Sequence, residues 1–93
     1  MNNDINLAYA ILRIAEEYDT DTANEILRMY SEAMHDGSCL MRLSYSDQLL
    51  NICSEYTFIH TVADIAQTLL DNGVITRYSL RASDTDISFR LIF

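Results

Sequence analysis

Hydrophobic residues in the first third of the chain recur at helical spacing in two separate runs. This spacing predicts one amphipathic helix for each run. Thr22 and Glu25 form a capping box for the second helix, and Gly37 is a natural stop after it. Only a few residues separate the two runs, so residues 1–36 are expected to fold as an antiparallel helical hairpin. The two apolar stripes consist of Leu7, Ala8, Ile11, Ile14, Ala15 and Tyr18, and of Ala23, Ile26, Leu27, Tyr30, Ala33 and Met34.

The middle of the chain predicts a short strand and two more helices. The run Cys39–Leu43 is apolar without a helical stripe, which indicates a brief strand. Ser44 or Ser46 is a possible cap for a third helix, and Thr57 for a fourth helix that ends at Gly73. The expected buried side of the third helix is Leu49, Leu50, Cys53 and Tyr56, and that of the fourth is Ile59, Val62, Ala63, Ala66, Leu69 and Leu70.

After Gly73 the apolar period changes from 3.6 to 2. Tyr78 and Leu80 alternate with polar positions, a polar turn follows at 82–86, and Phe89 and Leu91 alternate again. This pattern predicts a β-hairpin with one buried face. The expected fold is therefore mainly α with a C-terminal β-hairpin, an α+β protein.

Length and composition favour one domain. A chain of 93 residues fits a single core, and no internal repeat or linker interrupts it. Within residues 1–93 we expect an acidic helical hairpin over 1–36, followed by a second half over 39–93.

The charge balance is strongly acidic. Fourteen carboxylates face six arginines, there is no lysine, and the net charge is −8. Residues 1–36 hold eight of the acids and two of the arginines. Such a surface repels nucleic-acid phosphate at long range and favours a basic protein partner, although a merely solvated acidic face has the same composition. The residues expected to contact such a partner are Glu16, Glu17, Asp19, Asp21, Glu25 and Glu32.

No sequence motif points to catalysis. The chain lacks a glycine-rich phosphate loop, a Gly-x-Ser-x-Gly elbow and a helical His-Glu-x-x-His pair. Cys53 falls on an apolar helical stripe, so we expect a buried and inert thiol, while Cys39 is more open but lacks a base fixed by the sequence. We therefore expect a protein that is not an enzyme and has no cofactor.

The residue types also bear on metal binding and on the cellular compartment. His35, Cys39, Cys53 and His60 are zinc-type ligands, but their spacing matches no common zinc pattern, so we expect no metal. Two cysteines are too few for a disulfide framework, and no apolar run reaches the length of a membrane span. These features predict a cytoplasmic protein with reduced thiols and no membrane contact.

The order of elements from Ser46 to Phe93 resembles the winged helix-turn-helix superfamily. The segment Leu69–Arg77, a leucine–glycine–isoleucine pattern at the end of a helix and before a hairpin, carries most of the resemblance. The resemblance implies that helix 58–71 reads DNA and that the hairpin is a wing. It would assign phosphate contacts to Arg77, Arg81 and Arg90 and base contacts to Thr61 and Gln67. However, helix 58–71 contains no arginine and carries Asp64 and Asp71.

Two functions from different classes follow. The first is a small acidic binding protein that engages a basic protein surface, similar in size and charge to phage or mobile-element inhibitors of the anti-CRISPR or antirestriction type. The alternative is a winged-helix transcription regulator that binds DNA as a dimer. In either case residues 1–36 can bury a further apolar face, so a homodimer is plausible.

Overall fold

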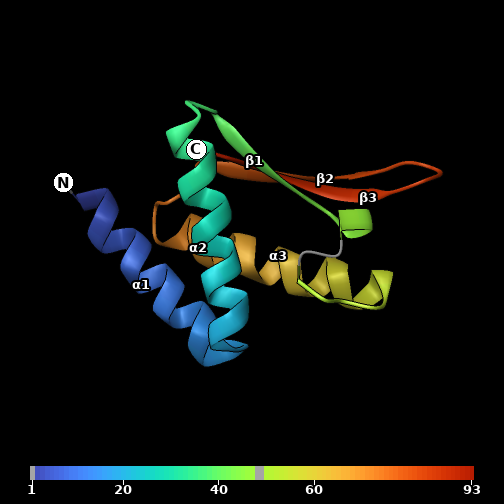
Figure 1. Cartoon of the computed structure of the whole chain (residues 1–93), viewed down its shortest axis with the longest axis horizontal. Helices are drawn as coiled ribbons and strands as arrows, with labels where there is room; N and C mark the ends of the chain where they lie inside the picture. The colour runs from blue at the N-terminus through green and yellow to red at the C-terminus, as the bar shows by residue number, and fades with distance from the viewer. Residues whose placement is uncertain (1, 48–49) are drawn as a thin grey trace.

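The structure, a computed structural model, describes residues 2–47 and 50–93 of the chain. Helices and an antiparallel sheet make up the described part, which is an α+β protein as predicted (Figure 1). The elements in chain order are α1 (Asn2–Glu17), α2 (Thr20–His35), β1 (Leu40–Ser44), the 3-10 helix η1 (Tyr45–Asp47), α3 (Glu55–Asp71), β2 (Arg77–Ala82) and β3 (Ile87–Ile92).

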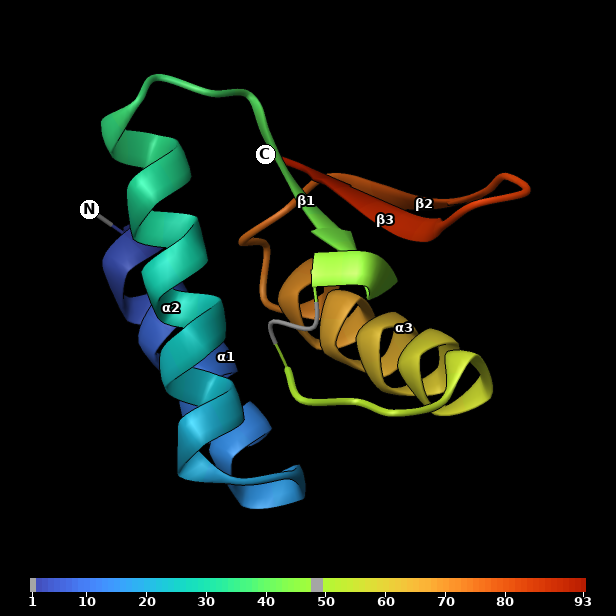
Figure 2. The ribbon, with the colours of Figure 1, turned by 45° about the vertical axis from the view of Figure 1, so that its right-hand side comes forward.

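The predicted helical hairpin is present, and α1 and α2 lie antiparallel side by side (Figure 2). Helix α2 begins at Thr20 because the Asp19 side chain accepts a hydrogen bond from the Thr22 backbone N–H at 2.6 Å. The predicted capping by Thr22 is therefore wrong by three residues. Gly37 follows α2 with a φ of +74°, and the Ser38 N–H donates to the Ala33 carbonyl at 2.9 Å, as a glycine stop requires.

The predicted third helix, with Ser44 or Ser46 as its cap, does not form as a separate α-helix in the described residues between β1 and α3. Tyr45–Asp47 form a single 3-10 turn, and Asn51–Ser54 are not helical. Asn51 has a φ of +58°, which lies in the left-handed region and cannot continue an α-helix. Asp86 also accepts hydrogen bonds from the Ser46 N–H and hydroxyl at 3.1 and 2.8 Å, which ties η1 to the start of β3.

The side chains assigned to the buried side of that helix take other positions. Cys53 and Tyr56 are exposed, so the prediction of a buried thiol at Cys53 is wrong. Leu50 is half-buried against the core. Leu49 lies outside the described residues.

Helix α3 is longer at its start than predicted. Ser54 caps it by accepting a hydrogen bond from the Thr57 N–H at 3.2 Å, so the helix begins at Glu55. Gly73 ends the helix with a φ of +74°, and the Val74 N–H donates to the Leu69 carbonyl at 2.9 Å. Its buried stripe consists of Phe58, Val62, Ile65, Ala66 and Leu69.

The predicted short strand and hairpin join into one antiparallel sheet with the order β1-β3-β2. The central strand β3 pairs Arg90 with Arg42 on one side and with Ser79 on the other. Since side chains alternate between the two faces of a strand, this register places Phe89 and Leu91 on one face and Arg90 on the opposite face.

Helix α3 covers the inner face of the sheet, and the helical hairpin stands beside both (Figures 1 and 2). Phe58 of α3 lies 5.9 Å from Phe89 of β3, measured between ring centroids. Tyr30 of α2 meets Phe93, the residue after β3, edge-on at 5.0 Å between ring centroids. One apolar cluster includes buried residues from α1, α2, β1, α3 and β3.

Truncation of the central strand tests this packing. Leu91 is fully buried, so Leu91→Ala should lower the free energy of unfolding by about 2–5 kcal/mol, because it removes contacts and leaves a cavity. Leu80→Ala, on the edge strand β2 where the side chain is 46% exposed, is the matched control and should cost clearly less. Chemical denaturation measures both, and equal losses would contradict the placement of β3 at the centre of the core.

Candidate functional site

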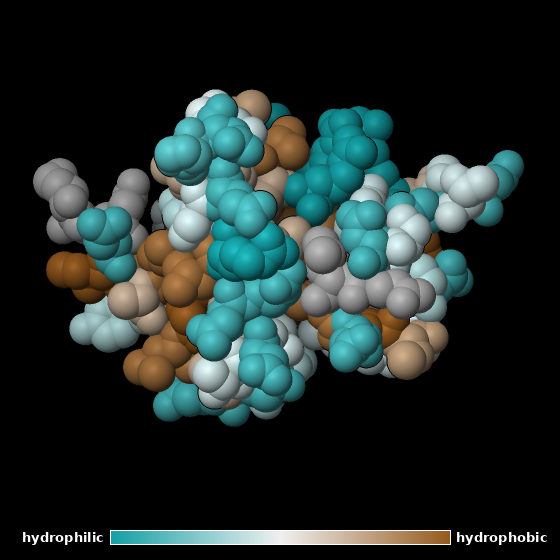
Figure 3. Space-filling view, viewed as in Figure 1, coloured by the Kyte–Doolittle hydropathy of each residue, from teal (hydrophilic) through white to brown (hydrophobic). Residues whose placement is uncertain are grey.

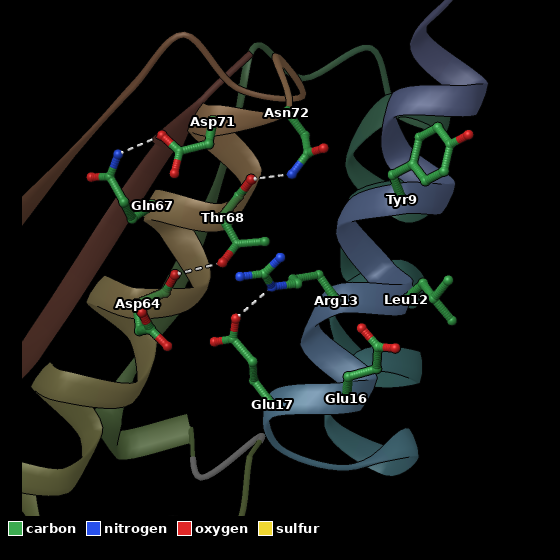
Figure 4. Close-up of a pocket in the computed structure, with 10 residues that line it drawn as sticks. All are labelled: Tyr9, Leu12, Arg13, Glu16, Glu17, Asp64, Gln67, Thr68, Asp71 and Asn72. Carbon is green, nitrogen blue, oxygen red and sulfur yellow. Dashed lines mark hydrogen bonds and ion pairs between the residues drawn. The ribbon is translucent and has the colours of Figure 1, made fainter.

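A groove of about 500 Å³ separates α1 from the second half of α3 (Figure 4). We call it the acidic groove. Its α1 wall carries exposed Tyr9 and Leu12 at the rim. The lining residues are Tyr9, Leu12, Arg13, Glu16 and Glu17 from α1, and Asp64, Gln67, Thr68, Asp71 and Asn72 from α3.

The two walls are positioned by apolar residues next to them on each helix. Ala10 and Ile14 of α1 are buried, and so are Ile65 and Leu69 of α3. Residues three or four apart lie on the same face of a helix, so the polar positions between these anchors form a separate stripe on each helix. The core contact between α1 and α3 therefore fixes where the carboxylates of the groove lie.

Four carboxylates and one guanidinium set the charge of the acidic groove. Arg13 Nε donates to Glu17 Oε1 at 2.8 Å, within the groove (Figure 4). The hydrogen bond and charge of Glu17 are the main causes that raise the pKa of Arg13 above its ordinary value, and the charges of Glu16 and Asp64 add to them. The groove is thus a negative environment that already attracts one cation from the chain itself.

A hydrogen bond between distant segments joins the end of α1 to Asp64, one of the carboxylates of the acidic groove. Tyr18, just after α1, donates its hydroxyl to Asp64 Oδ2 of α3 at 2.7 Å. Burial first, and then the hydrogen bond and charge of Asp64, raise the pKa of Tyr18 to about 12. Tyr18 is 38% exposed, so its assignment to the buried stripe of the first helix is wrong.

Polar side chains of α3 are held in place along the other wall. Gln67 donates to Asp71 Oδ1 at 2.8 Å and accepts from the Tyr78 hydroxyl of β2 at 2.9 Å. The Thr68 hydroxyl donates to the Asp64 carbonyl at 3.1 Å. These bonds orient the wall before any partner binds, which lowers the entropic cost of recognition.

The structure divides the six acids predicted to form one surface. Glu16 and Glu17 line the acidic groove, whereas Asp19 caps α2, and the Thr22 N–H lowers the pKa of that carboxyl. Asp21 is exposed in the first turn of α2.

The remaining two of these acids, Glu25 and Glu32, flank one arginine on α2. Both form ion pairs with Arg28, which lies between them on the exposed side of the helix. These hydrogen bonds lower the pKa of Glu25 and raise that of Arg28. Both acids are therefore occupied within the helix.

The arginines predicted for phosphate contact share one face of the sheet, and Arg42 joins them. Arg42, Arg77, Arg81 and Arg90 all occupy the face opposite to Phe89 and Leu91, by the register of the three strands. We call it the arginine face. Its complete set is Leu40, Arg42 and Ser44 on β1, Ile92, Arg90 and Ser88 on β3, and Arg77, Ser79 and Arg81 on β2.

Thr61 and Gln67, predicted for base contact, lie elsewhere. Both are on α3, beneath the inner face of the sheet, where Gln67 lines the acidic groove and Thr61 is half-buried. The structure therefore separates them from Arg77, Arg81 and Arg90, with which the sequence grouped them.

A second, apolar groove of about 440 Å³ runs between α1 and α2. We call it the apolar groove, and Figure 3 shows apolar side chains gathered over α1, next to α2. Asp4 is the only charged residue among those that line it, which are Asp4, Leu7, Ala8, Ile11, Leu12, Ala15, Thr20, Ala23, Asn24 and Leu27.

The zinc-type residues do not form a site. Within residues 2–47 and 50–93, no group of three or more His, Cys, Asp or Glu side chains is arranged to hold a metal ion. His60 instead lies against Tyr56 on α3, with 4.3 Å between the ring centroids. In the same described residues, no helix combines the length and the apolar character that crossing a bilayer requires.

Comparison with known proteins finds no family model, no curated protein and no solved structure that matches this chain. The geometry is therefore the basis for a functional conclusion. Sequence reasoning missed two parts of it: the approach of Asp64 and Asp71 to α1, and the place of Arg42 beside Arg90. The alternation of residues in β1 puts Arg42 on the other face of the strand from Met41 and Leu43. This alternation was a signal in the sequence for the position of Arg42.

The Tyr18–Asp64 bond predicts a specific alkaline instability. The ordinary pKa of tyrosine is 10.0 and that of Tyr18 in the fold is about 12. The fold favours the neutral phenol, so its stabilising contribution is complete below pH 10 and is lost between pH 10 and about 12.

Tyr18→Phe should therefore lower the free energy of unfolding at neutral pH. The variant should also show a smaller decrease of this free energy between pH 10 and about 12 than the wild type. Chemical denaturation across this range measures both effects. Tyr9→Phe, at a 63% exposed ring, is the control and should behave as the wild type. An unchanged alkaline decline in Tyr18→Phe would contradict the assignment.

Proposed function

We propose that the protein is a non-enzymatic binding protein that receives a basic segment of a protein partner in the acidic groove. The observation that carries this proposal is the meeting of Glu16 and Glu17 with Asp64 and Asp71 around one groove, from helices far apart in the sequence. Exposed Tyr9 and Leu12 add apolar contact area at the rim. Aromatic side chains next to charges are typical of protein interfaces.

The position of the acids supports a functional role because it is unfavourable for the helices. Glu16 and Glu17 lie in the last turn of α1 and Asp71 in the last turn of α3, and neither turn has a basic residue. The negative end of a helix dipole prefers cations by a few tenths of a kcal/mol or more per charge. Such local misfits are expected where binding requires the charge.

The chemistry of the lining favours recognition over nucleophilic catalysis. The acidic groove contains no histidine, cysteine, serine or lysine. Its carboxylates can accept hydrogen bonds from a partner's arginine or lysine in the geometry that Arg13 already adopts with Glu17. Carboxylates ordered on a surface also match a basic site that normally holds phosphates, so we propose a nucleic-acid-handling protein as the partner, as for phage or mobile-element inhibitors of the anti-CRISPR or antirestriction type.

Location in the cytoplasm is part of the same proposal. Cys39 and Cys53 are both free and exposed, which suits a reducing compartment.

A winged-helix-like arrangement of residues 39–93 is our proposal for the finer fold. The order β1, α3, β2, β3 and the strand order β1-β3-β2 support it. The single α-helix in the described part between β1 and β2, which carries Asp64 and Asp71, argues against α3 as a DNA-reading helix.

Charge reversal tests the acidic groove. Glu16→Lys and Asp71→Lys should each weaken binding of a short arginine- and lysine-rich peptide about tenfold, because each removes an attraction and adds a repulsion. Glu16→Lys should at the same time stabilise the fold by a few tenths of a kcal/mol, since it places a cation at the end of α1. Calorimetric titration and chemical denaturation measure the two effects.

The control is Asp36→Lys. Asp36 is exposed at the C-terminal cap of α2 and does not line the acidic groove. This variant changes the net charge by the same amount as the two groove variants. Its peptide affinity should stay within about threefold of the wild type. An equal loss in Asp36→Lys would show that net charge, and not the groove, binds the peptide.

We further propose that a second copy of the chain covers the apolar groove. Two copies with a charge of −8 repel, and this groove, with Asp4 as its single charge, lets them meet without opposing carboxylates. Ala8 is an exposed residue of the apolar groove, and glutamate is a good helix former, so Ala8→Glu should add a charge without disrupting α1. This variant should shift a dimer to the monomer in sedimentation experiments. A wild type that stays monomeric over the whole concentration series would refute the dimer.

A further inference from the structure

The arginine face concentrates positive charge in an otherwise acidic protein. It carries four of the six arginines and no carboxylate among its nine positions on the three strands. The other two arginines, Arg13 and Arg28, are both in ion pairs. Among the described residues, no carboxylate lies within ion-pair distance of Arg42, Arg77, Arg81 or Arg90.

The two acids nearest in sequence do not neutralise this face. Asp86 is engaged with Ser46 and with the Ile87 N–H, and these hydrogen bonds, that of the Ser46 hydroxyl first, lower its pKa. Asp84 is exposed in the turn between β2 and β3. Among the described residues, neither Asp84 nor Asp86 forms an ion pair with an arginine of the hairpin.

The arrangement is unfavourable for the free protein in two ways. Arg42 and Arg90 are direct cross-strand partners, and like charges at such positions destabilise a sheet. Arg90 is half-buried, and its buried Nε has no hydrogen-bond partner among the described groups. The chain has fourteen carboxylates, yet none of them pairs with these four arginines among the described residues. Their isolation therefore points to an external anion.

The face is open and extends over several phosphate spacings. Helix α3 covers only the inner side of the sheet (Figure 2). The side chains of Arg42, Arg77 and Arg81 are exposed. Neighbouring strands lie about 4.8 Å apart, and the four residue steps from Arg77 to Arg81 span about 13 Å. The guanidinium groups therefore spread over a surface and do not converge on one small anion.

We propose that the arginine face binds the phosphate backbone of duplex DNA. Arginine and serine side chains are suited to phosphate oxygens, and the face offers Ser44, Ser79 and Ser88 between the arginines. It has no aromatic residue on which unstacked bases could stack, which argues against a single-stranded ligand. The contact uses the sheet and not α3, so it differs from the helix-in-groove mode that the winged-helix resemblance implies.

Salt dependence of duplex binding tests the proposal. Four phosphate contacts predict that affinity falls about a hundredfold when the salt concentration rises fourfold, and three contacts predict about fortyfold. Fluorescence anisotropy with a short labelled duplex should show the larger fall for the wild type and the smaller one for Arg42→Gln, Arg77→Gln and Arg81→Gln.

Arg28→Gln is the matched control because it removes the same charge from α2, away from the sheet. It should keep the hundredfold fall. Circular dichroism confirms that each variant is folded. If Arg42→Gln, at the position paired with Arg90, does not fold, the variant at exposed Arg77 still tests the proposal.

Three results would overturn the proposal. The first is no duplex binding by the folded wild type at low salt, which would leave Arg42, Arg77 and Arg81 as solubilising groups on the edge strands. The second is a salt dependence of duplex binding that is reduced in Arg28→Gln as much as in Arg77→Gln. The third is tighter binding of a single strand of the same length, which would reject the assignment to duplex. None of these outcomes bears on the peptide titration of the acidic groove.

Discussion

The register of the central strand β3 is the constraint on which the rest of the structure depends. Because β3 pairs with β1 on one side and β2 on the other, it fixes which residues of all three strands share a face. Phe89 and Leu91 then pack toward α3, and Arg90 is placed with the other arginines of the sheet on the opposite face. A slip of one residue would exchange the two sets, which the burial of Phe89 and Leu91 makes very costly.

Charge is segregated around this frame. The helices carry most of the carboxylates, and the acidic groove gathers four of them between α1 and α3. The sheet carries four arginines on the side away from α3. A net charge of −8 therefore hides a molecule with two oppositely charged surfaces. In our account the acidic groove engages a basic protein and the arginine face touches DNA, so the protein would join both at a protein–DNA complex.

Local pattern was sufficient for most of the fold but not for the sites. Period and glycine stops predicted α1, α2, α3, the short strand and the hairpin. The third helix was wrongly predicted because Leu50, Cys53 and Tyr56 match a helical stripe. The left-handed Asn51 and the hydrogen bonds that Asp86 accepts from Ser46 depend on the tertiary structure. Asp64 and Arg13 lie 51 positions apart in the chain, so no local pattern could bring them to one groove. Net charge alone also concealed the isolation of the arginines.

The most direct test of the central claim, that opposite charges occupy separate surfaces, is a pair of amide chemical-shift titrations on one labelled sample. One titration uses an arginine-rich peptide and the other a short DNA duplex. The account predicts two sets of shifted amides without overlap, the first in α1 and the second half of α3, the second in β1, β2 and β3. A single shared set of amides, or peptide-induced shifts centred on the sheet, would contradict it.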